Sequence, residues 1–437
     1  MPLRLDTGDP GFEQAFAVFL SSKRETSADV AATVSAVLKD VRSDGDAALI
    51  RYTERFDRLQ LSGSELRIEP ERIAAAVAAV APDVMQALEL ATERIEQFHA
   101  RQDLSELRYT DPAGVELGAR WTPIDAVGLY VPGGLAAYPS SLLMNAVPAK
   151  SAGVGRIAMT VPTPDGKINP LVLAAAHLLG IDEIYRIGGA QAIGALAFGT
   201  ESIRPVDKIV GPGNAYVAEA KRQVFGTVGI DMIAGPSEIV VVADRDNRPD
   251  WVAIDLLSQA EHDESAQSIL ITDDGDFAHA VAAAVEEQLE TLPRAAIARA
   301  SWRDYGAIVV VDTLAAAPAL VDRIAPEHLE LAVADPEALS RQVRHAGAIF
   351  LGRFTPEAIG DYVAGPNHVL PTARRARFSS GLNVLDFVKR TTLVKCDPAS
   401  LAAIGPAAVT LAGQEGLDAH ARSVSIRLAA YDAEQGR

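Results

Sequence analysis

The chain of 437 residues has little cysteine, few aromatic residues and fewer basic than acidic residues. Its single cysteine, Cys396, cannot form an internal disulfide bond. We expect Cys396 to be a small buried side chain rather than a nucleophile. Lysine and arginine together number 40 against 58 acids, which gives a net charge of -18. Nucleic-acid binding is therefore not expected, because contacts with phosphates need a basic face.

Long apolar runs are also missing. No uninterrupted run is long enough to cross a bilayer, and residues 1–6 lack the basic flank and apolar core of a signal peptide. We therefore expect a cytoplasmic protein without a membrane partner. A hydrophobic content of 49% with only 5% aromatic residues favours an α/β enzyme rich in small aliphatic side chains, and the length allows two or three domains.

The spacing of apolar residues divides the chain into a helical part and an alternating part. Residues 27–40 and 70–99 have apolar side chains at helical spacing, which predicts helices in the first hundred residues. Two sets of strand-like runs follow, with helical patterns among them. They are 126–131, 156–161, 183–187 and 208–210 in the first set, and 239–243, 268–272, 307–311 and 348–351 in the second.

This alternation predicts an α/β fold with two doubly wound, incomplete Rossmann-like domains, each built on a parallel sheet. A small helical segment is expected over residues 1–25. The first α/β domain would combine residues 26–129 with 238–380, and residues 130–237 would form the second. Residues 381–437 carry a strand-like run at 387–390 but no strand–helix alternation, so we expect a separate C-terminal domain there.

Three glycine-rich turns each end a strand of the first set and precede a helical stretch. They are Pro132-Gly133-Gly134, Gly188-Gly189-Ala190-Gln191 and Gly211-Pro212-Gly213-Asn214. Glycine at such a turn lets a phosphate or a ring approach the backbone and the helix N-terminus. None of the turns matches the complete dinucleotide fingerprint, and each alone is more typical of a tight turn. Three of them at strand ends of one predicted sheet favour a ligand site.

Residues 256–263, Leu-Leu-Ser-Gln-Ala-Glu-His-Asp, place an amide, an imidazole and two carboxylates on about two turns of predicted helix. Gln259 and His262 are three residues apart and would share one face. The run follows the strand-like residues 238–244, and polar groups just after a strand of an α/β protein lie where ligands bind. This predicts a metal site. For these residues alone, a solvated helix face is an equally good interpretation.

Three further segments carry groups suited to proton transfer or metal binding. Glu327 and His328 follow Pro326, and a histidine beside a carboxylate can accept and return a proton. Taken alone, this dipeptide is more typical of a solvated helix start. Asp361, Asn367 and His368 lie in a predicted loop with Gly and Pro, which suits a ligand or an Asx turn. Glu415 and His420, in a predicted helical tail, are taken alone more typical of a surface.

Histidine, aspartate and glutamine side chains from dispersed segments could complete a Zn²⁺ site with nitrogen and oxygen ligands. The lack of a cysteine cluster excludes a structural zinc finger. The remaining histidines lie in ordinary helical or polar contexts, and we expect them to be structural. They are His99, His177, His279 and His345.

Together, seven segments of the chain resemble the histidinol dehydrogenase family. They occur in the family's order and extend over nearly the whole chain. One such motif is weakly specific, whereas seven in order are highly specific. The segments are 188–193, 211–216, 230–238, 258–263, 325–330, 365–372 and 415–420.

The resemblance implies an NAD⁺-dependent oxidation of L-histidinol to L-histidine through L-histidinal, with two NAD⁺, as the last step of histidine biosynthesis. It implies one Zn²⁺ per subunit, with the ligands Gln259, His262, Asp361 and His420. Glu327 and His328 match the family's acid/base pair. Residues 130–237 would be the NAD⁺-contacting domain, with contacts at Tyr130, Gln191 and Asn214. The positions that match substrate-binding residues are Ser237, Gln259, His262, His328, Asp361, His368, Glu415 and His420.

The resemblance also implies a homodimer with a swapped C-terminal domain, in which Glu415 and His420 complete the partner's site. Two alternatives remain open. A related group of dehydrogenases oxidises sulfonated diols with the same zinc and acid/base core, although residues 365–368 and the intact tail look more like the histidinol enzymes. A catalytically silent NAD- or metal-binding protein on the same fold is the other alternative, and the presence of both Glu327 and His328 speaks against it.

Overall fold

The structure is a computed structural model that describes residues 2–21, 28–102, 104–133, 138–233 and 235–434. Gly134, from the first predicted glycine turn, therefore lies outside the described residues. The chain divides into two compact units. The first comprises Met1–Arg101 and Asp125–Phe387, and the second comprises Gln102–Ile124 and Val388–Arg437.

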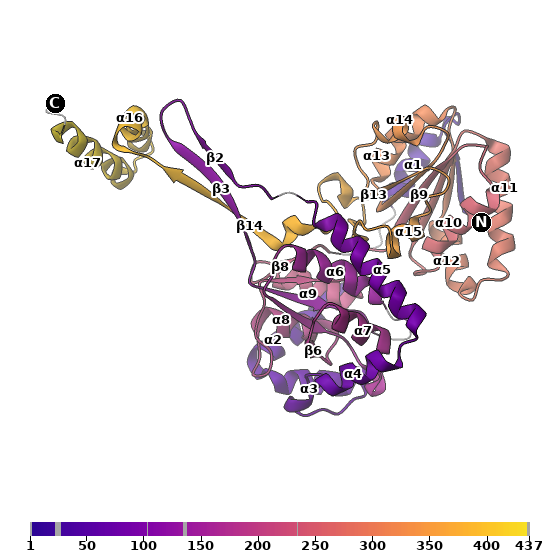
Figure 1. Cartoon of the computed structure of the whole chain (residues 1–437). Helices are drawn as coiled ribbons and strands as arrows, with labels where there is room; N and C mark the ends of the chain where they lie inside the picture. The colour runs from indigo at the N-terminus through magenta and orange to yellow at the C-terminus, as the bar shows by residue number, and fades with distance from the viewer. Residues whose placement is uncertain (1, 22–27, 103, 134–137, 234, 435–437) are drawn as a thin grey trace. The chain divides into compact units, whose positions relative to one another are not determined.

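The first unit contains a five-stranded parallel sheet with the order β6-β5-β4-β7-β8 (Figure 1). Counted along the chain, this order is 3-2-1-4-5, which is that of the first five Rossmann strands. The order reverses between β4 and β7, so the turns after these two strands flank the switch point. The strands are β4 (Ala126–Tyr130), β5 (Arg156–Thr160), β6 (Glu183–Tyr185), β7 (Lys208–Val210) and β8 (Gly229–Ile230). The four predicted strands of this set are confirmed.

Helices from two parts of the chain cover this sheet. One core cluster joins α2 and α3 to α8, α9 and the strands, through side chains such as Val34, Leu49, Ile193 and Val217. From the sequence, residues 26–129 were expected to share a domain with residues 238–380. The helices α2 and α3 lie in the first of these ranges, but they pack with residues 126–228. Elsewhere α4 packs on α7, and α5 on α6. The helices are α2 (Ala28–Asp44), α3 (Asp46–Asp57), α4 (Pro70–Ala79), α5 (Pro82–His99), α6 (Pro139–Ser151), α7 (Pro170–Leu178), α8 (Gly189–Phe198) and α9 (Ala215–Val224).

The predicted helix over residues 70–99 is two helices. Ala81 adopts an extended conformation and Pro82 begins α5. A residue before proline is pushed out of the helical region by the proline ring, so the apolar spacing continues while the backbone breaks. Together the two helices are apolar enough to resemble a bent membrane span, with an angle of 110° between them. No single helix in the described part of the chain is long and apolar enough to cross a bilayer.

A second parallel sheet of the first unit has six strands in the order β1-β11-β10-β9-β12-β13. Without β1 this order is again 3-2-1-4-5. The strands are β1 (Leu3–Asp6), β9 (Glu238–Ala243), β10 (Gln267–Thr272), β11 (Ala307–Val310), β12 (His328–Ala332) and β13 (Ala348–Leu351). The four strands predicted for this set are present. β1 and β12 were missed, and the edge strand β1 lies within the segment 1–25 that was expected to be helical.

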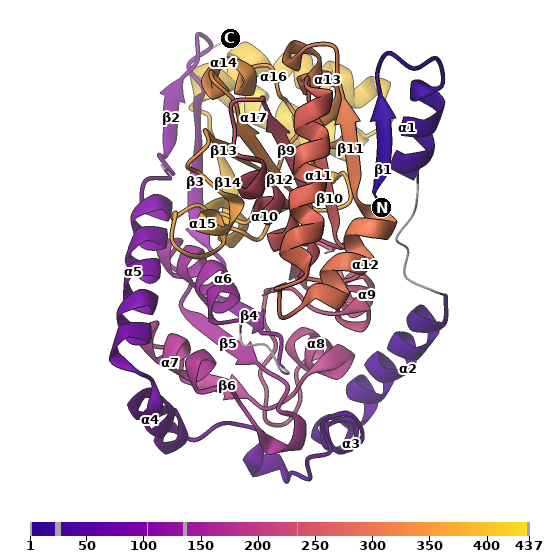
Figure 2. The ribbon, with the colours of Figure 1, turned by 90° about the vertical axis from the view of Figure 1, so that its right-hand side faces the viewer.

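Side chains along β9 alternate between the two faces of this sheet. Ile239 and Val241 pack with α10 (Pro249–Ala260), α11 (Gly275–Leu289) and α12 (Ala295–Tyr305), and Figure 2 shows α11 and α12 over this face. Val240 and Val242 pack with α1 (Phe12–Ser21), α13 (Ala317–Ile324) and α14 (Pro336–Ser340) on the other. Both faces are covered, as a parallel sheet requires.

The second unit has an antiparallel sheet of β2 (Leu107–Thr110), β3 (Glu116–Pro123) and β14 (Val388–Lys395), in the order β14-β3-β2. Two helices, α16 (Pro398–Gln414) and α17 (Asp418–Glu434), pack against each other. Cys396 lies between β14 and α16 and is exposed. The prediction of a buried cysteine is wrong, because the residue lies in the short connection between two elements rather than in a packed layer.

Candidate active site

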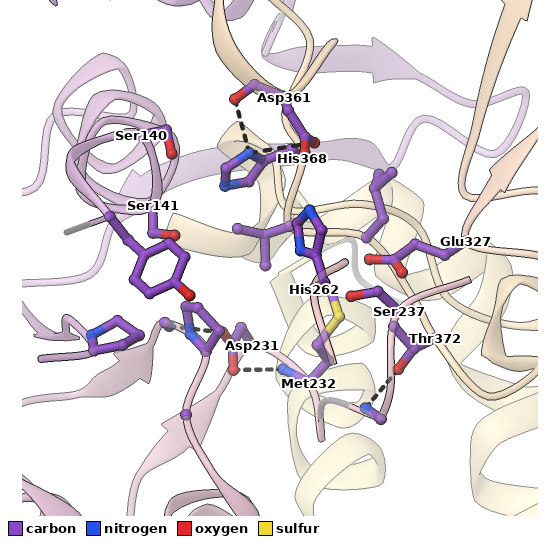
Figure 3. A pocket seen from close by; sticks show the side chains of 18 of the residues that line it. Ser140, Ser141, Asp231, Met232, Ser237, His262, Glu327, Asp361, His368 and Thr372 are labelled. Atoms are coloured by element: carbon purple, nitrogen blue, oxygen red, sulfur yellow. Dashed lines mark hydrogen bonds and ion pairs between the residues drawn. The ribbon is translucent and has the colours of Figure 1, made fainter. Parts of the chain in front are cut away.

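A cavity of about 360 Å³ lies in the first unit, between residues of the two parallel-sheet regions (Figure 3). It brings together most of the site residues predicted from the sequence, although their positions range over 155 residues of chain between the first and the last. Its predicted lining residues are Asn214, Ser237, Gln259, His262, Glu327, His328, Asp361 and His368. Residues that were not predicted also line it, including Ser140, Ser141, Lys221, Asp231 and Thr372.

Other predicted residues lie elsewhere. Tyr130 and Gln191 are buried beneath the turn at Gly188-Gly189, where the Tyr130 hydroxyl accepts a hydrogen bond from the Gly189 N–H at 3.1 Å. Neither belongs to the cavity lining. Glu415 and His420 belong to the second unit, at the end of α16 and on α17, and both are exposed.

The two sheets contribute opposite edges to the cavity. Pro132 and Gly211-Pro212-Gly213 follow the carboxyl ends of β4 and β7, at the switch point of the five-stranded sheet. Ser237, by contrast, precedes β9, and Glu327 and His328 lie at the start of β12. These groups therefore lie at the amino edge of the six-stranded sheet. The interpretation of Glu327-His328 as a solvated helix start is wrong, because both residues are buried and begin or precede a central strand.

The main chain of Glu238 holds both Glu327 and His328. Its N–H donates to Glu327 Oε2 at 3.0 Å, and its carbonyl oxygen lies 3.0 Å from His328 Nδ1. Pairing of β9 with β12 brings these groups into register, because His328 lies opposite Ile239. One peptide position of a central strand thus orients a carboxylate and an imidazole together.

This contact also defines the tautomer of His328. A carbonyl oxygen can only accept, so Nδ1 carries the proton and Nε2 has a free lone pair. Burial lowers the pKa of His328 to about 4, which keeps the ring neutral near pH 7. The contacts of 3.6–3.7 Å with Glu357 and Glu327 are therefore not ion pairs of a charged ring. Nε2 is a buried base without a hydrogen-bond partner in the described part of the chain.

Gln259 and His262 lie where α10 ends. The helix ends at Ala260, and His262 lies in a turn that its N–H closes by donating to the Gln259 carbonyl at 3.2 Å. The expected two-turn helix is therefore too long by the residues that follow Ala260, although both side chains still reach the cavity. Gln259 is 1% exposed, and its Oε1 accepts no hydrogen bond from any described residue. A buried carbonyl oxygen of this kind fits a metal ligand or a bound ligand.

Asp361 and His368 lie next to each other in the cavity wall (Figure 3). Asp361 lies on α15 (Glu357–Tyr362) and not in the expected loop. Its carbonyl oxygen lies 3.0 Å from His368 Nδ1, and its Oδ1 lies 3.6 Å from the same nitrogen. Burial lowers the pKa of His368, so its Nε2 is available as an acceptor.

Glu357 is a buried acid that the sequence interpretation missed. Together with His328 and Asp361 it forms a group whose ligand atoms lie within 4.8 Å of one another and could hold a metal ion. Burial, and then the charge of Asp361, raises the pKa of Glu357 to about 10, so the carboxyl is protonated near pH 7. Its place four residues before Asp361 on one helix face was the signal in the sequence.

The cavity offers two overlapping sets of ligands. Gln259, His262 and Asp361 supply one amide oxygen, one imidazole and one carboxylate, a donor set that suits Zn²⁺. The second set is His328, Glu357 and Asp361, and the Glu238 carbonyl orients its imidazole. Asp361 belongs to both sets, so the donor groups around it fit a metal ion.

Comparison with known proteins identifies the family. The model of the histidinol dehydrogenase family matches residues 20–428. Histidinol dehydrogenases of Rhodospirillum rubrum and Ruegeria pomeroyi are 66% and 64% identical, and each alignment covers 98% of this chain and 99% of the relative. A crystal structure of histidinol dehydrogenase from Elizabethkingia anophelis superposes with a TM-score of 0.94 at 38% identity and covers 99% of both chains. The resemblance of the seven segments is confirmed, and the chain belongs to the histidinol dehydrogenase family of NAD-dependent oxidoreductases.

Proposed function

We propose that the protein oxidises L-histidinol to L-histidine through L-histidinal, with two NAD⁺ and Zn²⁺. One observation supports this most directly: a neutral His328 and a carboxylate, Glu327, are held by the Glu238 main chain in the same cavity as Gln259, His262 and Asp361. The cavity also reaches the glycine turn at the switch point, which is where a dinucleotide binds in folds of this topology.

Gln259, His262 and Asp361 would hold the Zn²⁺, with His420 of the partner subunit as a further ligand. When bound, the ion would supply a fixed positive charge that orients the nitrogen atoms of the substrate, and it has no redox couple of its own. The unpartnered Oε1 of Gln259 supports its place among the ligands. His328 then remains free for proton transfer.

In the first oxidation, His328 Nε2 accepts the hydroxyl proton while hydride leaves the substrate carbon for NAD⁺. After NADH exchanges for a second NAD⁺, Glu327 accepts a proton from water as the water adds to the aldehyde, and His328 returns its proton to the aldehyde oxygen, which gives the neutral diol. His328 accepts the proton of the resulting diol during the second hydride transfer. Retention of the aldehyde in the buried cavity prevents its release as a reactive product.

We further propose a homodimer in the cytoplasm, in which Glu415 and His420 of each tail complete the site of the other subunit. Two features support this proposal. Both residues are exposed, and α16 and α17 carry exposed apolar side chains. Those side chains are Ile404, Leu411 and Ile426.

The decisive experiment measures NADH and histidine formed by zinc-loaded protein from L-histidinol and NAD⁺. A ratio of NADH to histidine near two, lost with a chelator and restored by Zn²⁺, would establish the four-electron reaction. A ratio near one would mean that the aldehyde is released. Turnover of a sulfonated diol without turnover of L-histidinol would retain the fold and metal site but replace the substrate.

A further inference from the structure

A buried lysine–aspartate pair forms part of the cavity wall at some distance along the chain from the acid/base residues. Lys221 lies on α9 and Asp231 follows β8, and their side chains are only 3% and 1% exposed. The two form an ion pair. Removing two charges from water costs several kcal/mol, and pairing often fails to offset this, so stability alone explains such a pair poorly.

The pair holds both polar atoms of a single residue, Gly211. Asp231 Oδ2 accepts a hydrogen bond from the Gly211 N–H at 2.8 Å, and Lys221 Nζ donates to the Gly211 carbonyl oxygen at 3.0 Å. The other oxygen, Asp231 Oδ1, accepts from the Met232 N–H at 2.6 Å, and Figure 3 shows this contact in the cavity wall. The pair thereby connects the end of β8 and the helix α9 to the end of β7 at Gly211.

The backbone turns sharply away from β7 at Gly211, and the hydrogen bonds from Lys221 and to Asp231 hold it in this conformation. Its φ is +115°, and a Cβ at this position would lie 2.1 Å from the Tyr130 carbonyl oxygen. From here the chain turns, so that Pro212 and Gly213 line the cavity and Asn214 caps α9 through the N–H groups of Tyr216 and Val217. Without the lysine, the Gly211 carbonyl would lose this donor and the turn could rotate.

We propose that Lys221 and Asp231 are positioning residues for NAD⁺, which act through Gly211 by holding the turn Gly211–Asn214 in the shape that receives the cofactor. This inference rests on the proposed function, because it takes the cofactor to bind at the switch point. It assigns the pair to cofactor binding, while Glu327 and His328 carry the proton transfers.

The test is steady-state kinetics of Lys221→Met in the zinc-loaded enzyme, with Lys150→Met as the matched control. Lys150 also donates to a main-chain carbonyl, that of Leu179, at 2.5 Å, but it does not contact the turn. Loss of a charged hydrogen bond should raise KM for NAD⁺ about tenfold to a hundredfold. We expect kcat, KM for L-histidinol and zinc content to change far less, and the control to keep the KM of the unaltered enzyme.

A second variant protects the test against misfolding. In Asp231→Asn the amide oxygen can still accept from the Gly211 N–H while the charge that faces Lys221 is lost, and NADH fluorescence titration reports cofactor affinity without turnover. Weaker NADH binding with unchanged zinc content would support the proposal. Unchanged NADH binding in both folded variants, or a rise in KM for L-histidinol alone, would overturn it. Failure of the unaltered enzyme to reduce NAD⁺ would instead reject the proposed function.

Discussion

His328 shows how one buried contact sets the chemistry of a side chain. The Glu238 carbonyl occupies Nδ1, and burial lowers the pKa of the ring to about 4, so the ring is neutral and Nε2 has a free lone pair at neutral pH. In most exposed positions an imidazole titrates near pH 6.5 and would be partly charged. The structure therefore places a neutral, buried imidazole beside a carboxyl group within a common dipeptide.

The variant His328→Asn should lower kcat by roughly 10²–10⁴-fold, which is the usual contribution of one proton-transfer group. Zinc content, measured by atomic absorption, should stay unchanged. His262→Asn should instead lose zinc and activity together. Loss of zinc from His328→Asn or from Glu357→Gln, with zinc retained by His262→Asn, would show that the metal uses the set His328, Glu357 and Asp361.

Asp57 gives a pH-dependent stability that is separate from the site. It is buried at the end of α3, where burial raises its pKa although its carboxylate accepts from the Thr163 N–H at 2.9 Å. A carboxyl with a raised folded pKa stabilises the fold at low pH, and this contribution is lost as pH rises through that pKa. Asp57→Asn can keep the hydrogen bond without the charge.

We therefore expect the melting temperature of Asp57→Asn, relative to the unaltered protein, to be higher at pH 8 than at pH 4. Thermal unfolding followed by circular dichroism at both pH values measures this difference. Asp182→Asn is the control, because that side chain is 84% exposed and should show no such trend. A difference that is the same at both pH values would contradict the assignment of the effect to the Asp57 charge.

Among the elements, α11 begins with a cap that can be removed without touching the cavity. Asp274 Oδ1 accepts from the Phe277 N–H at 2.8 Å, and Asp274 Oδ2 lies 3.3 Å from Arg245 Nε. Asp274→Ala should lower the free energy of unfolding by about 1 kcal/mol, as measured by urea titration, with unchanged kcat. Asp274→Asn keeps a capping oxygen, so its free energy of unfolding should fall by only a few tenths of about 1 kcal/mol. Equal losses in both variants would mean that the ion pair, not the cap, matters.

Apolar patterns predicted most strands of both parallel sheets, because fully buried strands such as β9 appear in the sequence as continuous runs of valine and isoleucine. β12 was missed since its sequence, His-Leu-Glu-Leu-Ala, contains two polar residues that the tertiary structure buries. Glu330, for example, is 3% exposed beside Asp255, and burial raises the pKa of both carboxyls. A local pattern carries no information about such a pairing with another segment.

The rule that ligands bind at the carboxyl ends of strands places cavity residues correctly for one sheet only. It located the turns after β4 and β7, which line the cavity. It also pointed to Gln259 and His262, whose side chains line the cavity from a different edge. They follow β9 in sequence, but α10 carries the chain back, and they lie near the amino edge with Ser237 and Glu327.

At the scale of the whole molecule, the proposed dimer predicts complementation between inactive variants. Subunits of His420→Asn have an intact His328, and subunits of His328→Asn have an intact tail. In a shuffled mixture, half of the dimers are mixed and each holds one complete site, so activity should recover to about a quarter of that of the unaltered enzyme. NADH formation before and after denaturation and joint refolding measures it. No recovery in a mixture shown to contain mixed dimers would mean that each chain completes its own site.

By itself, the sequence determined the family, the α/β class and eight residues that line the cavity, because motifs and buried strands are local features of the chain. Only the tertiary structure decided which of these residues meet. The pairing of β9 with β12 set the tautomer of His328, burial set the charge states of His328 and Glu357, and the Lys221–Asp231 pair was found at Gly211. Each of these depends on segments distant in sequence, whose contacts and loss of water no local pattern encodes.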